Sequence, residues 1–152
     1  MNPISKLLTP EDILLDVDAP GKKAIFEEVA RLFERRHGIP QAEVVDSLVA
    51  RENMGSTGLG QGVAIPHARI KALKKPVAAV VRMRIPIAFD SPDGKPVSEL
   101  VVLMVPQHAT EEHLKILAAV AQLFADRQFR EALRACGDAQ CVNSLFAGWP
   151  LP

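Results

Sequence analysis

The spacing of hydrophobic residues predicts helices and a short strand in the first third of the chain. Thr9 to Asp12 has the composition of a helix or turn start, and Ile13 to Val17 is expected to form a strand. From Lys22 to Arg36, apolar residues recur on one helical face before the stop signal at Gly38. Pro40 opens a second amphipathic helix that reaches Glu52.

The middle of the chain is rich in residues that favour strands. Val77 to Ile87 and Val97 to Val105 flank the turn residues 91–94, so we expect two antiparallel neighbours. From residue 63 to residue 67, apolar alternation predicts a further strand that Pro66 must end or place at an edge. His67 is therefore expected where a strand gives way to a loop.

The last third of the chain is predicted to be helical. Thr110 has the character of a helix N-cap, and a strongly apolar helix follows it as far as Phe124. Shorter helical segments are expected around Phe129 to Arg134 and Ala139 to Phe146. Strands interspersed with these helices favour an α/β fold in which helices cover both sides of a mixed sheet, in one domain spanning residues 1–152.

The net charge of the chain and the length of its apolar stretches argue against two classes of protein, those that bind nucleic acid and those that span a membrane. The chain has 152 residues and 18 Lys and Arg against 18 Asp and Glu, so its formal net charge is zero. This balance argues against nucleic acid as the main partner, because neutralising phosphates takes an excess of basic residues on one face. The apolar stretches are far shorter than the ~20 residues that cross a bilayer, so we expect a cytoplasmic protein without membrane insertion.

The two cysteines, Cys136 and Cys141, lie close together near the C-terminus. A second cysteine pair, which a four-cysteine metal site would need, is absent from the sequence. We expect free, partly buried thiols, because a lasting bridge is uncommon in a cytoplasmic protein. A disulfide between the two remains the alternative.

A glycine run follows the second predicted helix. Residues 55–62 hold four of the nine glycines of the chain, and no regular element is expected there. Such runs can direct several backbone N–H groups at one anion, and here Ser56 and Thr57 add hydroxyl donors. The run matches neither a P-loop nor a dinucleotide fingerprint, so no nucleotide cofactor is indicated. A flexible surface loop is the competing interpretation.

Two histidines are candidates for chemistry beside this run. Histidine has an ordinary pKa near ~6.5, so much of it is a neutral nucleophile at neutral pH, and His67 follows Gly62 by five residues. His113 lies in the first turn of the predicted helix after Thr110, where a helix N-terminus disfavours the imidazolium form. It could donate a hydrogen bond to a bound oxygen or to His67, or simply cap the core. A metal site formed by His67, His108 and His113 is a weaker alternative, because its spacing is unlike that of zinc sites.

The stretch from Arg51 to Arg69, which contains the glycine run and ends in Pro66-His67-Ala68-Arg69, resembles a known signature. It is similar to that of the enzyme IIA proteins of the phosphoenolpyruvate-dependent phosphotransferase system, fructose/mannitol-type superfamily, nitrogen-regulatory branch. The similarity extends over nearly the whole chain, with Gln61 and Ala68 standing where relatives often carry Asn and Gly.

The resemblance implies a three-layer α/β/α sandwich with a mixed sheet of about five strands flanked by helices. It further implies that the protein is a phosphohistidine phosphotransferase in which His67 accepts a phosphoryl group from a small HPr-like carrier. His113 and Arg51 match the second active-site histidine and the active-site arginine of the family. A transfer between imidazoles needs a cradle for three oxygens, and no metal or nucleotide cofactor is expected. The candidate phosphate-binding residues are Ser56, Thr57, Gly58, Gly60 and Gly62.

The branch of the family points to a regulatory output. The expected targets are sensor kinases or potassium transporters, which would respond to the phosphorylation state of the protein. An enzyme IIA component of fructose/mannitol-type sugar uptake is one alternative. The other alternative is a binding module of the same fold that is never phosphorylated. The presence of His67 and of the loop before it argues against this alternative.

Overall fold

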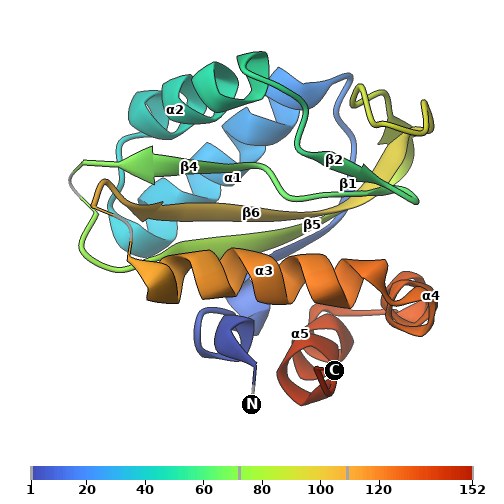
Figure 1. The fold of residues 1–152 in the computed structure, drawn as a ribbon. Coiled ribbons are helices and arrows are strands. Elements are labelled where there is room, and N and C mark those ends of the chain that lie inside the picture. Colours follow the sequence, from blue (N-terminus) through green and yellow to red (C-terminus); the bar gives the residue numbers. More distant parts are fainter. Residues whose placement is uncertain (1, 72, 109, 152) are drawn as a thin grey trace.

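The computed structural model describes residues 2–71, 73–108 and 110–151 (Figure 1). Within these ranges, the strands are β1 (Ile13–Val17), β2 (Gly58–Gly60), β3 (Val63–Ala64), β4 (His67–Ile70), β5 (Val77–Ile87) and β6 (Val97–Pro106). The α-helices are α1 (Lys22–His37), α2 (Gln41–Asn53), α3 (Glu111–Ala125), α4 (Arg127–Ala135) and α5 (Ala139–Gly148). Two short 3₁₀ helices, η1 (Pro3–Lys6) and η2 (Pro10–Asp12), precede β1. Among the described helices, none has the length and apolar character needed to cross a membrane.

The sheet is mixed and is built around β6. β5 pairs antiparallel with β6, as expected from the sequence, and β1 pairs parallel with the outer edge of β5. On its other edge β6 pairs in parallel with both β3 and β4, and β2 joins β3 antiparallel. The two short strands β3 and β4 thus share one side of β6, which makes a sheet of six strands.

Helices cover both faces of the sheet, so the predicted three-layer fold is confirmed (Figure 1). Alternate side chains of a strand point to opposite faces, and β6 is buried on both. Leu100, Val102 and Met104 pack in one core with α1 and α2. Val101, Leu103 and Val105 pack in the other core with α3, α4 and α5.

The predicted helices form close to their expected bounds. α1 begins at Lys22 and ends at His37, where Gly38 takes the left-handed conformation with φ 70°. That conformation costs little for glycine, so Gly38 ends the helix as its sequence position indicated. His37 is exposed as the last residue of α1, and the partial burial of its ring is the main cause that holds its pKa below the ordinary value.

Two expectations for the segment before His67 were wrong. The glycine run is not free of regular structure, because Gly58 to Gly60 form β2 and pair with β3. The strand predicted for residues 63–67 is interrupted, and His67 begins β4 instead of following a strand end. Pro66 lacks an N–H and so cannot donate to the ladder, yet its carbonyl accepts from the N–H of Leu103 at 2.9 Å. The chain therefore stays beside β6 and resumes pairing at His67.

The cysteines are joined, which corrects the expectation of free thiols. Cys136 and Cys141 form a disulfide with their Cα atoms 5.5 Å apart. α4 ends at Ala135 and α5 begins at Ala139, so the short connection folds the chain back and brings the two residues within bridging distance.

Reducing this disulfide is expected to lower the free energy of unfolding by up to ~2 kcal/mol, because a bond that closes a short loop removes only a modest chain entropy from the unfolded state. Urea unfolding with and without a reductant measures the difference. The double variant Cys136→Ala/Cys141→Ala is the control and should be insensitive to the reductant. Equal stabilities of the native protein under both conditions would contradict the bridge.

Candidate active site

A pocket of about 540 Å³ opens between α2, β4, β6 and the start of α3. Three side chains that the sequence singled out, Arg51, His67 and His113, come together around it. They arise from α2, β4 and α3, elements that lie on both sides of the sheet edge (Figure 1). The structure therefore assembles this trio from positions that are up to 62 residues apart in the sequence, between Arg51 and His113.

His67 is held in one tautomer by the backbone. Its Nδ1 atom lies 2.8 Å from the carbonyl oxygen of Ile65, and a carbonyl can only accept a hydrogen bond. In the neutral ring Nδ1 therefore carries the hydrogen, and Nε2 keeps its lone pair. The side chain is half-buried and lines the pocket. This geometry makes Nε2 the nucleophilic atom of the ring.

His113 has the opposite tautomer. Its Nδ1 accepts a hydrogen bond from the backbone N–H of Thr110 at 3.1 Å, so this nitrogen carries no hydrogen. The neutral ring then has its hydrogen on Nε2 and can donate it to a ligand oxygen. The pairing of His113 with the N-cap residue of α3 also fixes the orientation of the ring. His67 thus offers a lone pair at this pocket and His113 a donor.

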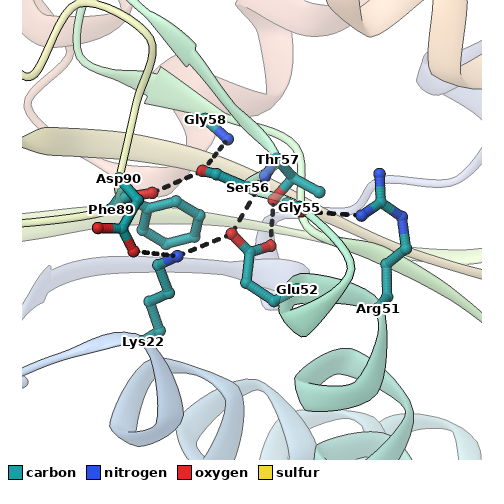
Figure 2. Close-up of polar contacts among 9 residues, drawn as sticks. All are labelled: Lys22, Arg51, Glu52, Gly55, Ser56, Thr57, Gly58, Phe89 and Asp90. Carbon is teal, nitrogen blue, oxygen red and sulfur yellow. Dashed lines mark hydrogen bonds and ion pairs between the residues drawn. The ribbon is translucent and has the colours of Figure 1, made fainter.

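Arg51 stands in the last turn of α2 and is half-buried. Its Nη1 donates to the carbonyl oxygen of Gly55 at 2.9 Å, which uses one of the five N–H donors of the guanidinium (Figure 2). A second arginine, Arg69, lines the same pocket. It follows His67 by two residues in β4 and so lies on the same face of that strand.

The charge of the pocket favours an anion. Its lining includes two arginines and two histidines and, among the described residues, neither Asp nor Glu. Apolar side chains also line the pocket, and the most exposed of them are Met54 at 83% and Leu114 at 58%. This lining can hold a small anion beside exposed apolar side chains.

The candidate phosphate-binding residues of the glycine run make other contacts than the lining of this pocket. The hydroxyl of Ser56 donates to the carbonyl of Phe89 at 2.6 Å, and that of Thr57 donates to Glu52 at 2.6 Å (Figure 2). Gly58 and Gly60 belong to β2, and Gly62 lies in the turn before β3. The pocket lining, as far as the chain is described, includes none of these five residues. Their role in binding a phosphoryl group stays a prediction.

The residues proposed for a metal site are not arranged as ligands. His108 is exposed, whereas His67 and His113 are half-buried at the pocket. Within residues 2–71, 73–108 and 110–151, no three His, Cys, Asp or Glu side chains gather in a way that could hold a metal ion.

Comparison with known proteins places the chain in a family. The family described as "Phosphoenolpyruvate-dependent sugar phosphotransferase system, EIIA 2" matches residues 6–148. The chain belongs to this EIIA 2 family. The resemblance found in the sequence is thereby confirmed.

Relatives of this EIIA 2 chain match it over most of its length. It is 39% identical to the nitrogen regulatory protein of Pseudomonas aeruginosa over 145 residues, and the aligned region covers 93% of each chain. The crystal structure of nitrogen regulatory protein IIA-Ntr from Neisseria meningitidis has a TM-score of 0.90 and 44% identity, covering 94% of this chain and 98% of that one. The fructose-specific EIIA component of Haloferax volcanii is 37% identical over 103 residues, 68% of this chain and 67% of the relative.

Two residues at or beside this pocket were not singled out from the sequence: Arg69, which lines it, and Glu52, which is buried next to Arg51. Arg69 was missed because the predicted strand ended at His67, so the rule that residues two apart in a strand share a face was not applied beyond it. Glu52 gave a weaker signal: it stands four residues after the buried Leu48, on the same helical face, yet a charged residue at a helix end is usually exposed. Its burial depends on partners from α1 and the glycine run.

Proposed function

We propose that this protein is a phosphoryl carrier that accepts a phosphoryl group on Nε2 of His67 from the phosphohistidine of an HPr-like carrier protein. The observation that carries the proposal is the 2.8 Å contact between Nδ1 of His67 and the carbonyl oxygen of Ile65. It leaves the lone pair of Nε2 available in a pocket lined by two arginines. Membership of the EIIA 2 family supports the same reaction class.

The transfer exchanges one N–P bond for another. The lone pair of Nε2 on His67 attacks phosphorus while the bond from phosphorus to the carrier nitrogen breaks, and its electron pair stays on the carrier. Arg51 and the Nε2–H group of His113 stabilise the negative charge on the three phosphoryl oxygens. Both are placed before the reaction by hydrogen bonds, Arg51 to Gly55 and His113 to Thr110, which lowers the cost of orienting them during transfer.

The output that we propose is regulatory. The relatives in P. aeruginosa and N. meningitidis are named nitrogen regulatory proteins, and each matches more than nine tenths of this chain. The expected targets are sensor kinases or potassium transporters that distinguish the phosphorylated from the unmodified form. Delivery to a sugar remains the second candidate, because the H. volcanii relative is named a fructose-specific component.

Incubation with phosphoenolpyruvate, enzyme I and an HPr-like carrier should add one phosphoryl group to His67. The adduct should be acid-labile and base-stable, and mass spectrometry of the intact protein and its peptides measures it. The variant His67→Ala should fold and remain unlabelled. His108→Ala is the matched control, because His108 is exposed and outside the pocket lining, and it should be labelled like the native protein. Labelling of His67→Ala would refute the assignment.

Replacing Arg51 or His113 by alanine should slow the transfer without moving the label from His67. Each change removes one donor to the transferring oxygens, and a buried donor of this kind is worth up to ~1,000-fold in rate. We expect smaller factors because both side chains are half-exposed. Single-turnover mixing with phosphorylated carrier measures the rates, and native rates in both variants would remove these residues from the mechanism.

Regulatory partners should bind over the pocket face and distinguish the two forms by at least several-fold. Phosphorylation adds a charge on the order of −2. The new charge would lie among the exposed apolar side chains of Met54 and Leu114. A partner that covers this rim would have to desolvate or repel the phosphoryl oxygens. Calorimetric titration of a target with both forms tests this, and equal affinities, or a footprint near Cys136 and Cys141, would contradict a direct charge switch.

A further inference from the structure

A buried carboxylate lies directly behind the candidate active site. The side chain of Glu52 is only 6% exposed, although it follows Arg51 in the last turn of α2. Three donors satisfy it: Nζ of Lys22 at 3.0 Å, the backbone N–H of Thr57 at 3.1 Å and the hydroxyl of Thr57 at 2.6 Å (Figure 2). Removing such a partner from a buried charge strongly destabilises the folded state. The folded protein therefore favours the conformation in which the carboxylate keeps its bonds to Thr57 and Lys22.

Lys22 is the counter-ion of Glu52. Burial lowers the pKa of Lys22, but its hydrogen bonds to Glu52 and Asp90 outweigh burial and raise the pKa above its ordinary value. The ammonium group also lies 4.6 Å from the centre of the Phe89 ring. These contacts join α1, the end of α2 and the start of the connection between β5 and β6 (Figure 2). The charged pair therefore links three segments that are distant in the sequence.

From Glu52, a chain of hydrogen bonds reaches the acceptor histidine. Glu52 accepts from both the N–H and the hydroxyl of Thr57, and the carbonyl of Thr57 accepts from the N–H of Ile65 at 3.1 Å. The carbonyl of Ile65 in turn accepts from Nδ1 of His67 at 2.8 Å. The position of this last carbonyl decides which nitrogen of His67 carries the hydrogen.

The same residue also supports the arginine of the site. The backbone carbonyl of Glu52 accepts from the N–H of Gly55 at 3.1 Å, and the carbonyl of Gly55 accepts from the guanidinium of Arg51 at 2.9 Å. Glu52 thus connects the turn that orients Arg51 with the strand segment that orients His67.

We propose that Glu52, with Lys22 as its counter-ion, is a positioning residue for phosphoryl transfer. Acting through Thr57 and Ile65, its carboxylate holds His67 in the tautomer with the hydrogen on Nδ1 and the nucleophilic lone pair on Nε2. The proposal rests on the proposed function of His67 as phosphoryl acceptor. It assigns Glu52 no contact with the phosphoryl group or the carrier, since Glu52 does not belong to the pocket lining of the described chain.

The test compares Glu52→Gln with Glu28→Gln, a matched control in which the same change affects an exposed ion pair of α1. Nitrogen-15 NMR of the unmodified protein reports the tautomer of His67 directly. In Glu52→Gln we expect the population to shift from the Nδ1–H form toward the Nε2–H form. The single-turnover transfer rate should fall about 10- to 100-fold, the scale of a small misplacement of reacting groups. The KM for the phosphorylated carrier should stay the same, and Glu28→Gln should match the native protein throughout.

Thr57 provides a second, independent pair of variants. Thr57→Val removes the hydroxyl that donates to Glu52 while keeping a similar shape, and Thr57→Ser restores a hydroxyl. We expect Thr57→Val to change the tautomer and slow the transfer, and Thr57→Ser to recover both. If Thr57 acted only by binding phosphate, the tautomer in the unmodified protein would not change. This pair also decides the question if Glu52→Gln does not fold.

A purely structural role gives a different result. Chemical unfolding would then show lower stability in Glu52→Gln and Thr57→Val, whereas the tautomer of His67 and the transfer rate would match the native protein, and the proposal would be overturned. Failure of the proposed function is separately visible, because the native protein would then take no label from the carrier. The tautomer measurement needs no phosphorylation, so it tests the positioning role in either case.

Discussion

The pairing of two consecutive strands with the same edge of β6 is the constraint on which the site depends. β3 and β4 both run parallel to β6, and Pro66 lies between them. The carbonyl of Pro66 keeps its bond to Leu103, so the chain is interrupted without leaving the sheet. Because β6 is buried on both faces, this edge cannot shift without disturbing two cores. His67 therefore begins β4 at a defined register, opposite Leu103 of β6, beside the pocket.

The glycine run is ordered by residues that lie outside it. Gln61, at the tip of the β2–β3 turn, has a left-handed φ of 59°. Its N–H donates to the carboxylate of Asp93 at 2.9 Å, and its carbonyl accepts from Arg134 at 2.7 Å. Arg134 is paired in turn with Glu99, a buried residue of β6. The run thus connects α2 with the central strand as a defined element, and its hydrogen bonds to Asp93 and Arg134 restrict its motion.

The buried and accessible charges of the molecule have separate roles. Buried Glu52 and Glu99 are each paired with a basic residue from another element, so their burial is compensated. The pocket itself has arginines without an acidic residue among its described lining. An anion that enters the pocket would therefore meet donors whose charge is not already neutralised at that surface. This separation fits a site that gains and loses a phosphoryl group, whereas the internal acids remain with the scaffold.

The sequence by itself determined the features that depend on local pattern. Apolar periodicity located α1 and α3 and the antiparallel pair β5 and β6, because a buried face requires a regular spacing of side chains. The glycine run and the residues around His67 indicated the family, since they form one continuous stretch.

Only the tertiary structure decided the features that need partners distant in the chain. The strand β4 exists because residues 67–70 pair in parallel with residues 103–106 of β6, and the local sequence pattern did not predict that pairing. The tautomer of His67 depends on where the carbonyl of Ile65 is held, and the burial of Glu52 depends on Lys22, thirty residues away. The bond between Cys136 and Cys141 likewise required the turn between α4 and α5. Such contacts are set by the packing of whole elements, which the local spacing of side chains does not encode.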